Sequence, residues 1–155
     1  MAEPGPSGPR VLLVDDDLGN LAVLRAALES EGIRVVGEAT DGEAGVALAK
    51  DLRPDVALID LLMPVMDGLQ ATRQIRGADL PTEVIILTFY DELLTEPANA
   101  AGAYAYLVKG CSVALMREVI LKAWGRAAER RAELRGRSGS MRLSLPHGAH
   151  PSIAH

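Results

Sequence analysis

The sequence predicts an α/β fold built on a five-stranded parallel sheet. Five short apolar segments alternate along the chain with segments of helical character, and this alternation indicates strands joined by crossover helices. Residues 56–59 are all apolar, as in a strand that is covered on both faces. The chain has 155 residues, of which 48% are hydrophobic, and this is enough material for one core and one domain.

The first half of the chain is expected to hold two strands and two helices. We predict strands over residues 11–14 and 34–39, each followed by a helix, over residues 18–30 and over about 42–52. Leucines recur in the first helix at the spacing of one buried face. The second helix ends before Pro54, because a proline disfavours helical angles in the residue that precedes it.

The central strand is followed by a helix and two further strands. Asp67 can cap a helix through Ile75, because its side chain can accept a hydrogen bond from a backbone N–H of the first turn. Residues 84–87 and 104–108 are expected to form the fourth and fifth strands. Right-handed crossovers then place helices on both faces of the sheet.

The helix between the last two strands is expected to be short. Proline is tolerated at the start of a helix and is damaging further in. We therefore predict a long connection through Glu96 and a helix that begins near Pro97, and Asn99 and Gly102 weaken it further.

The chain ends are expected to lie outside the folded domain. Ser112 can cap a last helix that continues to about Leu134. Residues 1–9 and 136–155 are rich in Gly, Ser and Pro and are predicted to be disordered. The predicted organisation is a disordered N-terminus (1–9), a folded domain (10–124), a basic extension of the last helix (125–135) and a disordered tail (136–155).

Polar side chains follow four of the expected strands. Asp15 and Asp16 follow the first strand, Asp60 ends the third, and Thr88 and Lys109 follow the fourth and fifth. Because the carboxyl ends of parallel strands meet at one edge of a sheet, Asp60 should meet at least one of the N-terminal acids.

A cation is required where these acids meet. Two carboxylates about 4 Å apart repel by roughly 4 kcal/mol at an effective dielectric constant of 20. Mg²⁺ suits a site of few carboxylates, because it prefers oxygen ligands and keeps several of its waters. The residues alone leave other interpretations open. Asp60 could belong to a turn, the N-terminal acids could cap a helix, and Lys109 could be a surface lysine. Asp17 is assigned to helix capping.

These residues resemble the receiver domain of two-component response regulators. The resemblance rests on the acids after the first strand, Asp60 followed by Met-Pro-Val-Met-Asp-Gly, Thr88 and Lys109. It covers about residues 10–124 and is closest to receivers of helix-turn-helix transcriptional regulators, in which a strand like Val-Val-Gly-Glu-Ala at 35–39 is typical. It implies a flavodoxin-like, doubly wound fold with strand order 2-1-3-4-5, which brings the first and third strands side by side.

The resemblance also implies roles for individual residues. Asp60 is expected to accept a phosphoryl group in the presence of Mg²⁺, held by Asp16 and Asp60, with Asp15 acting through water and the carbonyl of Leu62 as a further ligand. Lys109 and Thr88 are expected to bind the phosphoryl oxygens.

Three further aromatic or apolar positions are singled out. Tyr106 matches the family's switch aromatic, although an aromatic residue that simply covers the core of an edge strand is the alternative. Leu62 and Tyr90 flank the site, and their bulk could hinder the water that hydrolyses the phosphorylated form.

The expected function is that of a phosphorylation-activated switch rather than an enzyme acting on an external substrate, with self-catalysed phosphotransfer and autodephosphorylation only. The expected partners are a sensor histidine kinase and a downstream effector protein or fused output domain, and the long last helix is compatible with a homodimer. The alternative is the receiver part of a DNA-binding regulator that lacks its output domain here. A phosphatase with an aspartyl nucleophile is less favoured, because Asp15-Asp16-Asp17 fits that motif poorly and the chain lacks length for a substrate cap.

Charge and composition limit the remaining possibilities. The net charge is −5, but from residue 126 onward six arginines face two glutamates, which leaves −9 for residues 1–125. An acidic body argues against nucleic-acid binding by the folded domain, and direct binding by this chain is not expected. No run of 18 apolar residues or N-terminal signal pattern occurs and there is one cysteine, so we expect a cytoplasmic protein without a membrane span.

Overall fold

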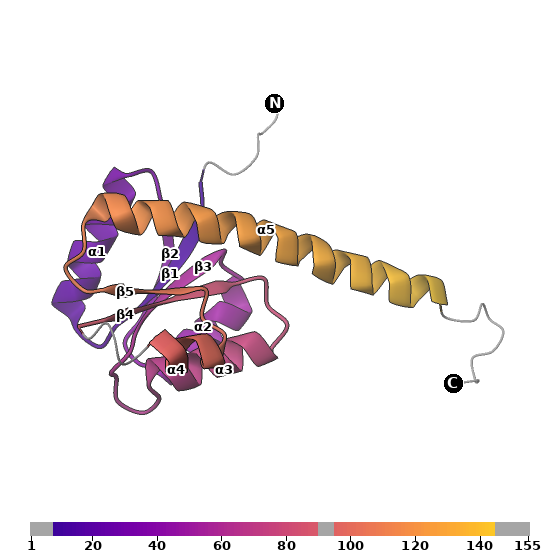
Figure 1. The fold of residues 1–155 in the computed structure, drawn as a ribbon, viewed down its shortest axis with the longest axis horizontal. Coiled ribbons are helices and arrows are strands. Elements are labelled where there is room, and N and C mark those ends of the chain that lie inside the picture. The colour runs from indigo at the N-terminus through magenta and orange to yellow at the C-terminus, as the bar shows by residue number, and fades with distance from the viewer. Residues whose placement is uncertain (1–7, 90–94, 145–155) are drawn as a thin grey trace.

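The fold is a five-stranded parallel sheet between two layers of helices (Figure 1). A computed structural model describes residues 8–89 and 95–144. The elements are β1 (Arg10–Val14), α1 (Leu18–Ser30), β2 (Arg34–Ala39), α2 (Gly42–Leu52), β3 (Val56–Asp60), α3 (Gly68–Gly77), β4 (Glu83–Thr88), α4 (Thr95–Ala101), β5 (Ala105–Val108) and α5 (Val113–Ser144).

The strand order β2-β1-β3-β4-β5 confirms the predicted topology. Every neighbouring pair is parallel, and β3 lies between β1 and β4. Val14 is paired with Ile59, and Asp60 is paired with Leu87. The carboxyl ends of β1, β3 and β4 are therefore level with one another.

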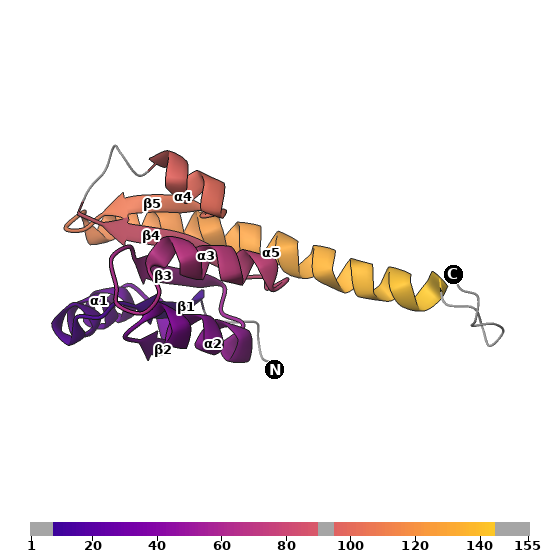
Figure 2. The same cartoon turned by 90° about the horizontal axis from the view of Figure 1, so that it is seen from below.

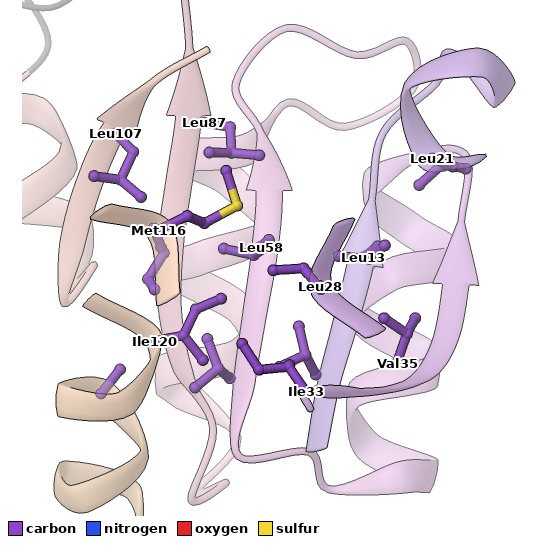
Figure 3. Packing of buried hydrophobic residues seen from close by; sticks show 14 residues of the cluster. Leu13, Leu21, Leu28, Ile33, Val35, Leu58, Leu87, Leu107, Met116 and Ile120 are labelled. Carbon is purple, nitrogen blue, oxygen red and sulfur yellow. The ribbon is translucent and has the colours of Figure 1, made fainter. Parts of the chain in front are cut away.

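Each face of the sheet buries its own hydrophobic core, because successive residues of a strand point to opposite faces. One core joins the sheet to α1 and α5, and the other joins it to α2, α3 and α4. In β3, for example, Leu58 faces α1 and α5, whereas Ala57 and Ile59 face the other layer. Figure 3 shows the first core, in which Leu28 of α1 and Ile120 of α5 pack over the central strands.

Aspartate caps begin the first three helices, as predicted for Asp17 and Asp67. The side chains of Asp17, Asp41 and Asp67 each accept a hydrogen bond from the backbone N–H three residues later, which satisfies a donor of the first turn. Asp67 also forms a reciprocal capping box with Gln70. The assignment of Asp17 to capping is therefore confirmed.

The helix α4 is short, as predicted, but it begins at Thr95 rather than near Pro97. Proline is accommodated as its third residue because the backbone N–H groups of a first turn have no partner within the helix. Tyr90 lies outside the described residues, so the interpretation placed on it stays a prediction.

The helix α5 is longer than predicted. It runs through Ser144, so residues 136–144 are helical where disorder was predicted, while residues 1–7 and 145–155 lie outside the described part of the chain. Its first half covers the sheet, and its second half extends beyond the body of the molecule (Figures 1 and 2). Once a helix is nucleated on a core, each added residue costs little, which explains why poor helix formers can continue it.

Arginines tie the middle of α5 to the amino ends of two strands. Arg130 Nε lies 2.9 Å from the Glu83 carboxylate at the start of β4, and Arg131 Nη2 lies 3.0 Å from Asp55, just before β3. Farther along, Arg137 lies 3.5 Å from Asp79. These long-range ion pairs were not visible in the sequence pattern, and of the three arginines only Arg137 lies beyond the predicted end of the helix near Leu134.

None of the helices in residues 8–89 and 95–144 combines the length and the apolar composition needed to cross a lipid bilayer.

Candidate functional site

The predicted polar residues converge at the carboxyl edge of the sheet. Asp15 directly follows β1, Asp60 and Thr88 are the last residues of β3 and β4, and Lys109 directly follows β5. Asp15, Asp60 and Thr88 are 1%, 7% and 1% exposed. Polar groups are placed in such surroundings only where partners or ligands compensate for lost water.

Lys109 bridges two of the acids. Its Nζ lies 3.1 Å from Asp60 Oδ1 and 3.3 Å from Asp15 Oδ2. Carboxylate oxygens of Asp15, Asp16 and Asp60 all lie within 4.8 Å of one another. Among the described residues at this edge, three carboxylates therefore face one ammonium group, and the site carries an excess of negative charge.

Local hydrogen bonds fix the orientation of Asp15. The backbone N–H of Asp17 donates to Asp15 Oδ1 at 2.9 Å, and Asn20 Nδ2 lies 3.5 Å from Asp15 Oδ2. Asp16 is exposed at the rim. Asp15 thus has a fixed orientation within the site, whereas Asp16 is accessible to solvent and to an incoming ion.

The protonation of Asp60 reflects the crowding. Burial raises the pKa of Asp60 above its usual range, and the hydrogen bond from Lys109 opposes that effect only in part, while Asp15 and Asp16 raise the pKa further. Burial would lower the pKa of Lys109, but the hydrogen bonds and charges of Asp60 and Asp15 outweigh burial, and the pKa of Lys109 is raised. Lys109 therefore carries a positive charge at neutral pH, and a further positive charge near Asp60 would stabilise its ionised form.

The donor set fits a hard divalent cation. The three side chains whose ligand atoms cluster here offer carboxylate oxygens, two of these side chains are buried, and Mg²⁺ binds through a small number of such oxygens together with water. The acids line a cavity of about 220 Å³, which also includes Leu62, Thr88 and Lys109. The cavity has room for a hydrated ion, whereas acids packed directly against their partners would leave no such space.

Gly68 shapes the loop below Asp60. Its backbone N–H donates to the carbonyl of Leu61 at 2.8 Å, and a Cβ atom at this position would lie 2.5 Å from the Asp60 carbonyl oxygen. Only glycine lets the first turn of α3 approach the end of β3 so closely. The Asp67-Gly68 pair therefore serves both to cap α3 and to seat it against the site.

Thr88 and Tyr106 occupy the positions that the sequence predicted. The carbonyl of Thr88 accepts a hydrogen bond from the Lys109 N–H at 2.7 Å, which ties the ends of β4 and β5 together. Tyr106 lies on β5 in register with Ile86, is partly buried and packs against the core beneath α2, α3 and α4. Its role as a switch stays a prediction.

Sequence reasoning missed Phe89 and Asn20. The Phe89 ring centre lies 5.0 Å from Lys109 Nζ, and Phe89 lines the same cavity as the acids. Asn20 lines the cavity beside Asp15. Phe89 could have been suspected from its place directly after Thr88, whereas Asn20 lies in the first turn of α1, where its sequence position carries no such signal.

Comparison with known proteins gives the family. The model of the response regulator receiver domain matches residues 11–121. The transcriptional regulatory protein LiaR of Bacillus subtilis is 43% identical over 113 residues, which are 72% of this chain and 54% of LiaR. This chain spans about half the length of the curated relatives that it matches.

Solved structures agree with the sequence relatives. The signal receiver domain of the putative response regulator NarL from Mycobacterium tuberculosis is 37% identical, with a TM-score of 0.71 and coverage of 77% of this chain and 98% of that domain. The receiver domain of the sensor histidine kinase PA1611 from Pseudomonas aeruginosa has a magnesium ion coordinated in its active-site cleft. It is 34% identical, with a TM-score of 0.67 and coverage of 76% and 98%. The fold, the arrangement of the acids and these matches together show that the chain belongs to the response regulator receiver domain family.

Proposed function

We propose that this chain is a phosphorylation-activated signalling switch that accepts a phosphoryl group on Asp60 from a sensor histidine kinase. The observation that carries the proposal is the cluster of three carboxylates, two of which contact one ammonium group, with Lys109 Nζ at 3.1 Å from Asp60. An anionic nucleophile among fixed charges is suited to phosphoryl transfer, because catalysis of that reaction is mainly positioning and charge neutralisation.

Mg²⁺ would be held by Asp16 and Asp60, by Asp15 through water and by the carbonyl of Leu62. When bound, it supplies the positive charge that Asp60 and the phosphoryl oxygens require. The open rim at Asp16 and the cavity of about 220 Å³ support this assignment.

The transfer itself is assigned to side chains of this chain. A carboxylate oxygen of Asp60 attacks phosphorus in line, the oxygen–phosphorus bond forms, and the bond from phosphorus to the donor's imidazole nitrogen breaks. Lys109 turns from the Asp60 carboxylate toward a phosphoryl oxygen, and the Thr88 hydroxyl donates to another. Tyr106, which lies on β5 beside β4, is assigned to sense the displacement of Thr88.

The product is the modified protein rather than a released molecule. The matched relatives are response regulators and transcriptional regulators and not classical enzymes. Self-catalysed phosphotransfer and loss of the phosphoryl group are therefore the only chemistry proposed. The output passes to an effector protein or to a fused domain, and a homodimer is a compatible assembly.

A second candidate is the receiver part of a DNA-binding transcriptional regulator. It is favoured by the names of the relatives LiaR and NarL and by their length, which is about twice the matched region. If residues 126–155 contact DNA through their arginines, deleting them abolishes binding at low salt, because such contacts are electrostatic. If the intact chain does not bind DNA at low salt, then any DNA binding would have to come from a separate output domain.

Intact-mass spectrometry tests the proposed function. After incubation with acetyl phosphate and Mg²⁺, the wild-type chain should gain about 80 Da, the mass of one phosphoryl group, and Asp60→Asn should gain nothing. Asp51→Asn is the matched control, because Asp51 is an exposed acid on α2 away from the site. An adduct of equal yield in Asp60→Asn, or no adduct in the wild type, would contradict the proposal.

A further inference from the structure

Phe89 lies where two cavities meet at the candidate site. It is the only phenylalanine of the chain, follows Thr88 directly and is 70% exposed. It lines the acidic cavity together with Lys109, and it also lines a neighbouring cavity of about 210 Å³ with Leu24 and Met116. Phe89 and Lys109 thus form part of a wall shared by a polar and a largely apolar space.

The ring of Phe89 lies over the ammonium group of Lys109. The distance from Nζ to the ring centre is 5.0 Å, within the range of a cation–π contact. The same nitrogen lies 3.1 Å from Asp60 and 3.3 Å from Asp15. An ammonium group has three N–H donors, so the two carboxylates leave capacity for one more favourable contact.

The surroundings of Lys109 strengthen that contact. The lysine side chain is 13% exposed, so water competes little for its nitrogen. A cation–π contact gains strength as the cation is withdrawn from water. The ring itself is largely exposed. The strength of the contact should therefore lie between that of a fully exposed and that of a fully buried cation–π contact.

We propose that Phe89 is a positioning residue for Lys109 in the phosphotransfer proposed above, on which this inference rests. A ring face attracts a cation without fixing the direction of its N–H bonds. It therefore holds the ammonium group at the rim of the site while allowing it to turn from the Asp60 carboxylate to a phosphoryl oxygen. A third carboxylate in place of the ring would hold Lys109 more rigidly and add negative charge.

Substitutions at residue 89 distinguish the effect of the aromatic ring face from the effect of side-chain size. Phe89→Leu keeps an apolar side chain of similar size and loses the ring face, whereas Phe89→Tyr keeps the face. Tyr104→Leu is the control for the loss of a partly exposed aromatic ring, since Tyr104 is 38% exposed and precedes β5 at the opposite end of that strand. Urea unfolding and Mg²⁺ affinity of each variant show whether the fold and the acids are intact.

The rate of phosphorylation by acetyl phosphate is measured by intact mass at saturating Mg²⁺ over a range of donor concentrations. Phe89→Leu should lower the maximal rate constant roughly two- to ten-fold, a factor between those of an exposed and a desolvated cation–π contact. Phe89→Tyr and Tyr104→Leu should retain the wild-type value. In a Lys109→Met background, Phe89→Leu should cause no further loss, because a double-mutant cycle removes effects that do not pass through Lys109.

Three results would overturn the inference. Phe89→Leu could match the wild type, Phe89→Tyr could be as slow as Phe89→Leu, or Phe89→Leu could have the same effect with Lys109 and with methionine at position 109. In each case the wild-type chain still acquires its adduct on Asp60 and the proposed function stands. If the wild type acquires no adduct, the proposed function fails and this inference falls with it.

Discussion

The two edges of the sheet both bury acidic side chains, but they supply positive charge in different amounts. At the amino edge, Glu83 is paired with Arg130 at 2.9 Å and with Arg76 at 3.8 Å, and Asp55 is paired with Arg131 at 3.0 Å. At the carboxyl edge, the described residues place three carboxylates within 4.8 Å of one another, and the ammonium group of Lys109 is paired with two of them, Asp60 and Asp15.

The difference teaches which buried charges stabilise the fold and which form a site. A buried acid that is paired with an arginine forms a structural ion pair, because the charge of each compensates the lost hydration of the other. Acids in excess remain costly until a ligand arrives. The amino edge therefore holds α5 in place, and the carboxyl edge is suited to bind a cation and a phosphoryl group.

The largest effect is expected from removing the acid of the amino edge. Glu83→Ala leaves Arg76 and Arg130 without their common partner, and burial already lowers the pKa of Arg76, which Glu83 opposes. Breaking a buried ion pair from one side costs about 3–5 kcal/mol, so urea unfolding should show a loss in that range. Glu29→Ala, which removes a surface pair with Arg25, should cost at most about 1 kcal/mol. Equal losses in the two variants would remove the distinction between buried and surface pairs.

A smaller loss is expected at the contact between α5 and β3. Arg131 donates to Asp55 and to the carbonyl of Arg53. Arg131→Ala should lower the free energy of unfolding by about 1.5–3 kcal/mol, the value of a hydrogen bond to a charged group. It should also speed amide hydrogen exchange in residues 126–137 more than elsewhere. Uniform exchange rates in α5 of the variant would show that the arginine does not hold the extension.

The carboxyl edge should respond with the opposite sign. Asp60→Asn should stabilise the metal-free protein on the order of 1 kcal/mol, because it removes one of several crowded negative charges. The pKa of Asp60 is raised by burial above its ordinary value of 3.8, so folding disfavours its ionised form. The penalty is full above the raised pKa and disappears as the pH falls below 3.8.

The advantage of the variant should therefore be present at neutral pH and shrink toward zero on acidification. Urea unfolding with EDTA at several pH values measures it, with Asp51→Asn as the control of unchanged stability. Destabilisation by Asp60→Asn at neutral pH would show that the pairing with Lys109 outweighs the repulsion.

An effect of similar size to that of Asp60→Asn is expected from strain in the loop after β3. Val65 has a φ of 73°, a left-handed conformation that is unfavourable for a β-branched residue, and it is 75% exposed. Val65→Gly should stabilise the protein by about 1 kcal/mol. The same substitution at Val23, an exposed position within α1, should destabilise it by about 0.5–1 kcal/mol. A loss of stability in Val65→Gly would mean that the side chain contributes packing that outweighs the strain.

Most of the fold and the site could be predicted because their signals are local. Apolar runs marked the strands, and the polar residues at the ends of four of these runs marked the edge at which Asp15, Asp60, Thr88 and Lys109 meet. The alternation of strands and helices, together with the family resemblance, then fixed which strands lie side by side.

What could not be predicted depends on contacts between distant segments. The composition of residues 136–144 favours disorder, yet the helix is anchored earlier by Arg130 and Arg131, whose partners lie 47 and 76 residues away in the chain. Phe89 gains its significance from a lysine that is supplied by another strand. Neither relation leaves a periodic pattern in the sequence.

Titration with Mg²⁺ by calorimetry tests most directly whether the uncompensated acids form a cation site. The wild-type chain should bind one ion, and Asp60→Asn and Asp16→Asn should each weaken binding by at least about tenfold, since a carboxylate ligand is lost. Asp51→Asn should bind like the wild type. Absence of binding by the wild type, or equal affinity in Asp60→Asn, would contradict the account.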